Sequence, residues 1–108
     1  METKTIMLAC SAGMSTSLLV SKMQAAAKKT GVDYKIFATA ASDVPNQLTS
    51  AAKPDVLMLG PQIAYMKADM QKQADQAGIP MAIINMQDYG MMNGAGVLSA
   101  AEKLMKSK

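Results

Sequence analysis

The stretch Thr5-Ile-Met-Leu-Ala-Cys10-Ser-Ala-Gly-Met-Ser-Thr-Ser17 decides how the fold of this 108-residue chain is interpreted. Its first half, Thr5 to Cys10, is a short run that is apolar almost throughout. Such a continuous run, without polar alternation, is typical of a parallel strand that is covered on both faces. Small residues follow the run, and a helical pattern begins among them at Ser15. The stretch therefore predicts a strand, a tight loop and a helix in direct succession.

The same pattern recurs along the chain. Three further apolar runs predict strands, at Asp33 to Ala38, Asp55 to Leu59 and Met81 to Asn85. The strands and helices alternate as βαβαβαβα, which predicts an α/β fold with a parallel sheet and right-handed crossovers. The length and the single apolar core predict one domain over residues 1–108.

Apolar residues at helical spacing lie between and after these runs. The first helix is expected to stop near Gly31, and the second to have Ser42 as its N-cap, with Val44, Leu48 and Ala52 on one face. The third is expected to end near Gly78. The fourth is expected to begin after Gly94-Ala95-Gly96.

The composition excludes several classes of site. The chain has no His, no Arg and a single Cys, so a phosphohistidine, a guanidinium clamp and an internal disulfide are all excluded. A structural zinc site is not expected in a chain with no His and one Cys. The net charge of +3 is spread along the chain, and one Phe, three Tyr and no Trp offer little for stacking bases, so we expect no nucleic-acid partner.

The apolar runs are far shorter than the roughly 20 residues that span a bilayer. The first residues, Met1-Glu2-Thr3-Lys4, lack the basic region and long apolar run of a secretory signal. We therefore expect a soluble, cytoplasmic protein without direct membrane insertion, whose ends favour a free-standing polypeptide.

The loop after the first strand is the candidate functional site. Ligands of open α/β sheets bind beyond the carboxyl ends of the strands, where Cys10 is expected to lie. Small residues allow the backbone to curl, with Gly13 free to adopt positive φ, so that N–H groups and the helix N-terminus form an anion nest. Such a nest also favours the thiolate form of a cysteine, which is a strong nucleophile for phosphorus. The alternative is that Cys10 is only a small buried hydrophobic residue.

Four segments resemble one family. Cys10-Ser-Ala-Gly-Met-Ser-Thr-Ser-Leu-Leu-Val-Ser-Lys-Met23 is similar to the loop and helix of the IIB component of the lactose/cellobiose/chitobiose class of the phosphoenolpyruvate-dependent sugar phosphotransferase system. Val56-Leu-Met-Leu-Gly-Pro-Gln-Ile-Ala-Tyr-Met66 resembles its third strand and the following helix. Asp88-Tyr-Gly90 and Gly94-Ala-Gly-Val-Leu98 resemble its last loop and helix, so the resemblance extends over essentially the whole chain.

The resemblance implies a flavodoxin-like, three-layer fold with a four-stranded parallel sheet in the order 2-1-3-4. It implies that Cys10 accepts a phosphoryl group from a phosphohistidine of the IIA component and passes it to a sugar in the membrane component IIC. The sugar implied is cellobiose or a related β-disaccharide, and the protein would act transiently at the inner face of the membrane. The implied site has Gln62 and Tyr89 on its rim, and the resemblance implies neither a metal nor an organic cofactor. The implied phosphate-binding loop consists of Ser11, Ala12, Gly13, Met14, Ser15, Thr16 and Ser17.

Two other functions are weighed against the carrier. The loop also resembles that of low-molecular-weight tyrosine phosphatases, but Thr16 stands where those enzymes have an Arg that clamps the transition state. Asp88 is the single candidate for the acid that hydrolysis would need. The third possibility is a regulator without catalytic activity, which binds an anion or a partner helix through a Met-rich surface and would tolerate Cys10→Ser.

Overall fold

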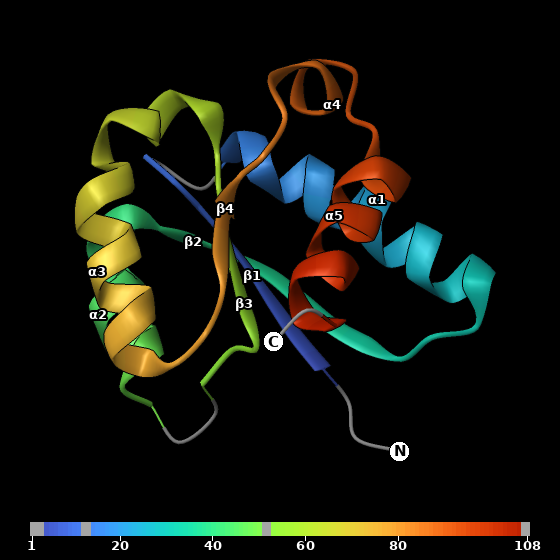
Figure 1. Ribbon diagram of the computed structural model, residues 1–108. Coiled ribbons are helices and arrows are strands. Elements are labelled where there is room, and N and C mark those ends of the chain that lie inside the picture. The colour runs from blue at the N-terminus through green and yellow to red at the C-terminus, as the bar shows by residue number, and fades with distance from the viewer. Residues whose placement is uncertain (1–3, 12–13, 51–52, 107–108) are drawn as a thin grey trace.

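Four parallel strands form one sheet in the order β2-β1-β3-β4, as expected (Figure 1). The structure is a computed structural model and describes residues 4–11, 14–50 and 53–106. The strands are β1 (Lys4–Cys10), β2 (Tyr34–Ala40), β3 (Val56–Leu59) and β4 (Met81–Ile83). The α-helices are α1 (Met14–Thr30), α2 (Val44–Leu48), α3 (Lys67–Ala77), α4 (Met86–Gly90) and α5 (Gly94–Lys106), and the 3₁₀ helices are η1 (Ala41–Asp43) and η2 (Pro61–Met66).

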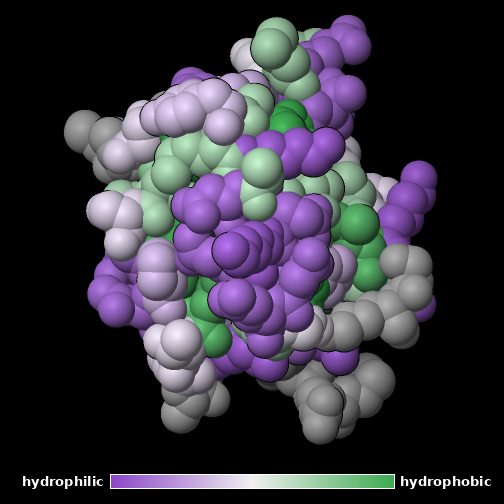
Figure 2. Space-filling model, turned by 60° about the vertical axis from the view of Figure 1, so that its left-hand side comes forward, coloured by the Kyte–Doolittle hydropathy of each residue, from purple (hydrophilic) through white to green (hydrophobic). Residues whose placement is uncertain are grey.

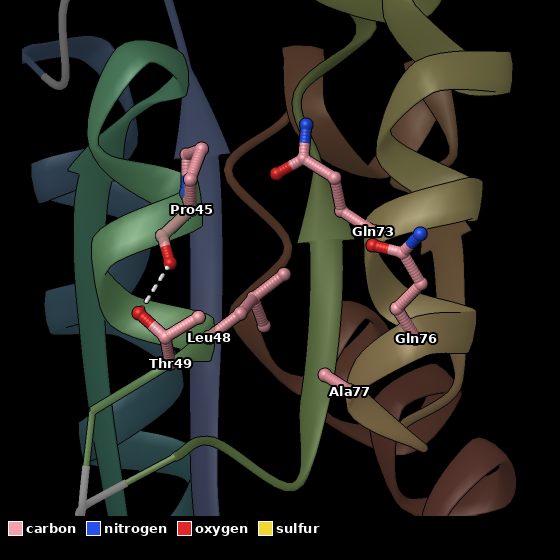
Figure 3. A pocket seen from close by; sticks show the side chains of 6 residues that line it. All are labelled: Pro45, Leu48, Thr49, Gln73, Gln76 and Ala77. Atoms are coloured by element: carbon pink, nitrogen blue, oxygen red, sulfur yellow. Dashed lines mark hydrogen bonds between the residues drawn. The ribbon is translucent and has the colours of Figure 1, made fainter.

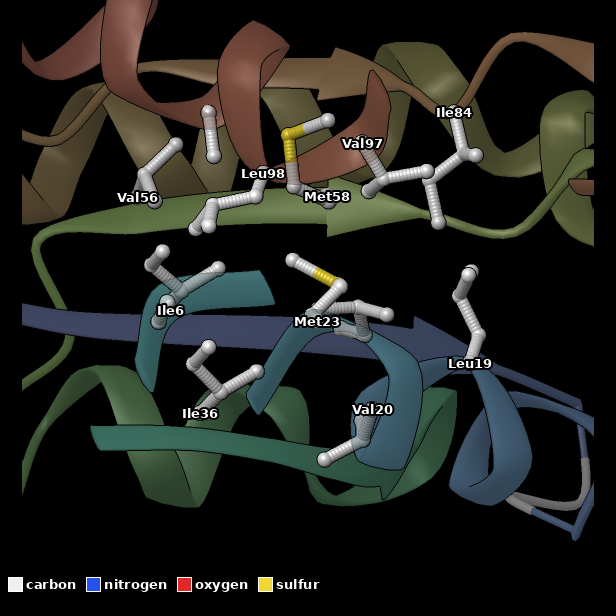
Figure 4. Packing of buried hydrophobic residues seen from close by; sticks show 13 residues of the cluster. Ile6, Leu19, Val20, Met23, Ile36, Val56, Met58, Ile84, Val97 and Leu98 are labelled. Atoms are coloured by element: carbon white, nitrogen blue, oxygen red, sulfur yellow. The ribbon is translucent and has the colours of Figure 1, made fainter. Parts of the chain in front are cut away.

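Helices cover both faces of the sheet, which explains why the strand sequences are apolar throughout. Along β1, Ile6 and Leu8 point into one apolar cluster and Met7 and Ala9 into the other, as the two-residue period of a strand requires. The first cluster is completed by α1 and α5, and Figure 4 shows their side chains meeting those of the strands. The second is completed by α2, η2 and α3. The result is the expected three-layer arrangement.

The outward side of the α2–α3 layer is polar. In Figure 2, where the left-hand side of Figure 1 comes forward, hydrophilic residues gather in the middle of this face. On α3 the apolar stripe is narrow, because Met70 and Ala74 are buried while the residues around them are charged or amides. Two helices end at a glycine with positive φ, Gly31 after α1 and Gly78 after α3, as the sequence predicts.

The predicted start of the second helix is wrong. Ser42 is not an N-cap, because it lies inside η1 and the residue that precedes α2 is Asp43. The Asp43 carboxylate accepts hydrogen bonds from Gln47 and Asn46, which lower its pKa. Ala52, expected on the same helix face, lies outside the described residues.

The last helix begins earlier than predicted, at Gly94, so its glycines lie inside its first turn. Gly94 is buried against α1: a Cβ there would overlap the backbone carbonyl carbon of Lys22 and lie 2.6 Å from the Met23 nitrogen. The glycine therefore allows α5 to approach α1 closely. Asn93 starts the helix, since its side-chain oxygen accepts a hydrogen bond from the Gly96 N–H at 3.1 Å.

Candidate functional site

The carboxyl ends of β1, β3 and β4 meet at one edge of the sheet, which is the upper edge in Figure 1. Each strand is followed there by a helix: α1 follows β1, η2 follows β3 and α4 follows β4. The hydrogen bond from the Ile84 N–H to the Leu59 carbonyl, at 2.7 Å, keeps the chains after β3 and β4 together. The candidate site lies at this edge, where open α/β sheets bind ligands.

Cys10 is the last residue of β1, where the sequence predicts it, and is 1% exposed. Ser11 follows in an exposed bend, and α1 begins at Met14, so the helix N-terminus lies four residues after the cysteine. The first amides of a helix have no intrahelical acceptor and carry a partial positive charge. The backbones of Met14, Ser15, Thr16 and Ser17 form this first turn, whereas Ala12 and Gly13 lie outside the described residues.

Gly60 brings the loop after β3 against Cys10. Its N–H donates to the Ala9 carbonyl at 2.8 Å, and its Cα faces the cysteine: a Cβ at Gly60 would lie 3.5 Å from the Cys10 Cβ. The φ of Gly60 is −65°, which any residue can adopt, so the glycine leaves space beside Cys10 and is not needed for backbone freedom. The same Cβ would lie 2.8 Å from the Gln62 side-chain oxygen. The Gln62 amide and the Cys10 side chain therefore border the same small space.

The two predicted rim residues are joined to each other. The Gln62 Nε2 donates to the Tyr89 hydroxyl at 2.6 Å, which connects η2 to α4 across the edge of the sheet. Tyr89 is partly buried and packs against the apolar cluster that α1 and α5 complete. The structure therefore places Gln62 and Cys10 on either side of Gly60 and joins Gln62 to Tyr89.

Gly60 and Asn85 are site residues that the sequence interpretation missed. Asn85 caps α4: its side-chain oxygen accepts from the Gln87 and Asp88 amides, and its carbonyl accepts from the Tyr89 amide at 2.9 Å. An Asn directly after an apolar strand is an ordinary N-cap signal. A Gly-Pro pair at the end of a strand is an ordinary turn signal. Both signals were present, but neither indicates that the residue supports a site.

Asp88, the candidate acid of a phosphatase, takes part in the connection between α4 and α5. Its carboxylate accepts a hydrogen bond from the Asn93 side chain at 3.2 Å, and Asn93 in turn caps α5.

In the part of the chain that the structure describes, no three His, Cys, Asp or Glu side chains are grouped as metal ligands. None of the helices described here is long and apolar enough to cross a membrane.

Large apolar side chains are exposed around the same edge. These are Leu18, Tyr65, Met86 and Met91, which are between 53% and 81% exposed. Leu18 lies in the N-terminal part of α1 and Tyr65 lies in η2. Met86 is the first residue of α4, and Met91 follows the last residue of that helix. Exposed apolar residues that gather around a candidate site are typical of a docking surface for another protein.

A separate hollow of about 260 Å³ lies between α2 and α3 (Figure 3). Apolar side chains and glutamine amides line it, and none of the predicted site residues contributes to it. The lining residues are Pro45, Leu48, Thr49, Gln73, Gln76 and Ala77.

Comparisons with known proteins agree on one family. The model of the family "PTS system, Lactose/Cellobiose specific IIB subunit" matches residues 5–100. A galactose-specific EIIB component of the phosphotransferase system from Lactococcus lactis subsp. cremoris (strain MG1363) is 61% identical over 107 residues, which are 97% of this chain and 99% of the relative. A cellobiose-specific EIIB component from Lactococcus lactis subsp. lactis (strain IL1403) is also 61% identical, with the same coverage.

A solved structure agrees with these relatives. The solution structure of a cellobiose-specific IIB component from Borrelia burgdorferi is 36% identical, has a TM-score of 0.81, and covers 99% of this chain and 95% of that one. The lactose-specific IIB domain from Streptococcus pneumoniae is 15% identical with a TM-score of 0.80, covers 95% of this chain and 98% of that one, and shares the fold. The chain belongs to the lactose/cellobiose-specific IIB subunit family of the sugar phosphotransferase system, whose members are phosphotransferases that serve sugar transport.

Proposed function

We propose that the protein carries a phosphoryl group on Cys10, between the IIA component and a sugar bound by the membrane component IIC. We also infer that residues 1–108 form one IIB domain, since the family model matches residues 5–100. The protein would work in the cytoplasm, transiently at the inner face of the membrane. The observation that supports the proposal most is the position of Cys10, at the carboxyl end of β1, four residues before the start of α1 and against Gly60.

Two substitutions at phosphorus make up the reaction. In the first, the Cys10 thiolate attacks the phosphohistidine of IIA, the S–P bond forms, the N–P bond breaks and its electrons return to the imidazole. In the second, a sugar hydroxyl attacks the phosphocysteine, the O–P bond forms, the S–P bond breaks and the hydroxyl proton is released. The thiolate is restored, so the protein carries the group without net change.

Neutral dipoles would hold the phosphoryl group. No charged side chain occurs between Thr5 and Ser21, and the chain has no Arg. The proposed contacts are the backbone amides of Ala12, Gly13, Met14, Ser15 and Thr16. Dipoles at a helix N-terminus stabilise a dianion without supplying the bidentate clamp that phosphatases use to hydrolyse it.

Cellobiose or a related β-disaccharide is the proposed sugar. Two relatives of equal identity are named for galactose and cellobiose, and a third, from Bacillus subtilis (strain 168), is 40% identical over 102 residues and named for oligo-β-mannosides. Transport assays with the membrane component would compare cellobiose, lactose and galactose directly.

Phosphorylation of the protein by purified phosphotransferase components tests the proposal. The protein is incubated with phosphoenolpyruvate, the general phosphotransferase proteins and a IIA component of this class, and its intact mass is compared with that of Cys10→Ser. One phosphate on the wild type alone is expected. If the wild type takes up no phosphate but hydrolyses an aryl phosphate, the protein is a phosphatase and not a carrier. If it neither takes up phosphate nor hydrolyses the aryl phosphate, the results favour the regulator without catalytic activity.

A further inference from the structure

Two methionines expose their side chains at the carboxyl edge of the sheet. Met86 is 75% exposed and Met91 is 72% exposed, whereas the other methionines whose side chains the structure describes are buried or half-buried. The two flank α4, which lies at the upper edge of the molecule in Figure 1. Their thioether sulfurs are therefore open to small molecules in solution, at the same edge as the candidate site.

Exposure decides which of these sulfurs an oxidant such as hydrogen peroxide can reach. The thioether sulfur uses a lone pair to form an S–O bond, the O–O bond of the peroxide breaks, and the peroxide leaves as water. The sulfur is oxidised and the peroxide is reduced. The product, methionine sulfoxide, is polar where the thioether was apolar, and methionine sulfoxide reductases convert it back.

Oxidation at these positions would change the surface without changing the fold. The hydrogen bonds that hold α4 come from other groups: the Asn85 side chain accepts from the first amides of the helix, and the Tyr89 hydroxyl accepts from Gln62. Met86 and Met91 belong to the exposed apolar side chains around the carboxyl edge. A partner that covers this edge would have to bury a sulfoxide oxygen without a hydrogen-bond donor, which is unfavourable.

We propose that Met86 and Met91 form an oxidation-sensitive site, at which hydrogen peroxide produces methionine sulfoxides that weaken docking of the phosphoryl donor. The proposal rests on the carrier function and adds regulation by an oxidant: phosphoryl transfer slows while Cys10, which is 1% exposed, keeps its thiol. Reduction of the two sulfoxides restores the transfer.

Peroxide treatment followed by a transfer assay tests the proposal. The protein is treated with hydrogen peroxide and then with dithiothreitol, which returns any sulfenic acid or disulfide of Cys10 to the thiol. Peptide mass spectrometry should find oxygen on Met86 and Met91 before it appears on the buried Met70. The initial rate of transfer from a limiting concentration of IIA should fall about fivefold or more, while the final extent of phosphorylation stays the same. Methionine sulfoxide reductases should restore the rate.

Substitutions show which sulfurs are responsible. Met86→Leu combined with Met91→Leu keeps the apolar surface and removes both thioethers, so this variant should keep its rate after the same treatment. Met86→Gln combined with Met91→Gln makes the surface polar without an oxidant, and should slow transfer while the thermal midpoint stays that of the wild type. The matched control is Met105→Leu, which removes a half-buried methionine beside Lys4 and should remain as sensitive as the wild type.

The assay also separates this proposal from the carrier function. If both sulfoxides form and the rate is unchanged, or if the treated double leucine variant loses as much rate as the treated wild type, the regulatory role of Met86 and Met91 is wrong and the carrier function stands. If the untreated wild type accepts no phosphate, both proposals fall together.

Discussion

At the scale of single residues, the surroundings of Cys10 distinguish the proposed phosphoryl carrier from a purely structural buried cysteine. Burial alone does not distinguish the two roles, since structural cysteines are also buried. The distinguishing features are the helix start four residues later and the glycine whose missing side chain leaves space beside the Cys10 Cβ. Sequence patterns could place Cys10 at a strand end, but the Gly60 contact depends on the packing of β3 beside β1.

A residue far from this edge gives a clear test of the packing. The Tyr34 hydroxyl donates to the Glu102 carboxylate at 2.7 Å, which ties β2 to α5. Burial, and then the hydrogen bond and charge of Glu102, raise the pKa of Tyr34 to about 12. We expect Tyr34→Phe to lower the free energy of unfolding at neutral pH by about 1 kcal/mol, measured by urea denaturation.

The same pKa shift predicts a pH dependence. Between the ordinary tyrosine pKa of 10.0 and about 12, the unfolded state loses the Tyr34 proton while the folded state keeps it. The unfolded state then binds fewer protons, so the stability that Tyr34 contributes is complete below pH 10 and is lost as the pH rises toward 12. Tyr34→Phe should show a shallower decline of stability over this range. Parallel declines in the two proteins would contradict the assignment.

At the scale of helices and strands, the sequence predicted which elements exist better than it predicted the residues at which they begin and end. The four strands were expected because continuous apolar runs are a strong signal, and the order 2-1-3-4 came from the family resemblance. The short α4 was missed, because one and a half turns carry no helical periodicity to detect. Ser42 was a misleading N-cap, since a tight 3₁₀ turn forms before α2 and places the helix start at Asp43.

Gly94 gives the prediction that belongs to this scale. A methyl there would overlap the backbone of α1 at Lys22, and backbone cannot move aside as a flexible side chain can. We expect Gly94→Ala to destabilise the protein by about 1–3 kcal/mol or more, because α1 and α5 must separate. The matched control is Gly90→Ala, where nothing lies within 4 Å of the added methyl and φ is ordinary. A change within about 0.5 kcal/mol is expected for it. Equal effects of the two substitutions in thermal denaturation would contradict the close packing of the helices.

At the scale of the whole molecule, the carboxyl edge of the sheet and the outer side of the α2–α3 layer differ in character. The exposed large apolar side chains lie around the carboxyl edge, whereas the outer side of the α2–α3 layer is polar (Figure 2). Leu18, Tyr65 and Met86 lie far apart in the sequence, and they lie around one edge only because three strands end there. In the proposed function, a phosphoryl donor would have to dock at that edge to reach Cys10.

Removing apolar side chains around the carboxyl edge should slow phosphoryl transfer from IIA. We expect Leu18→Ala combined with Tyr65→Ala to lower the rate of phosphoryl transfer from IIA roughly three- to tenfold, since truncated apolar contacts weaken docking. Stability should change little, because the two side chains are 53% and 81% exposed. Rapid-quench measurements over a range of IIA concentrations would detect the loss. A rate equal to that of the wild type, with Gln76→Ala as control, would mean that IIA docks elsewhere.

The central claim is that Cys10 carries the phosphoryl group. The most direct test is the intact mass of the protein after incubation with phosphoenolpyruvate, the general phosphotransferase proteins and a IIA component. The account predicts one phosphate on the wild type and none on Cys10→Ser, and an adduct that is stable to mild base but lost on treatment with iodine, as a phosphocysteine is. A wild type that stays unmodified with several IIA components of this class, or a Cys10→Ser protein that takes up phosphate equally, would contradict it.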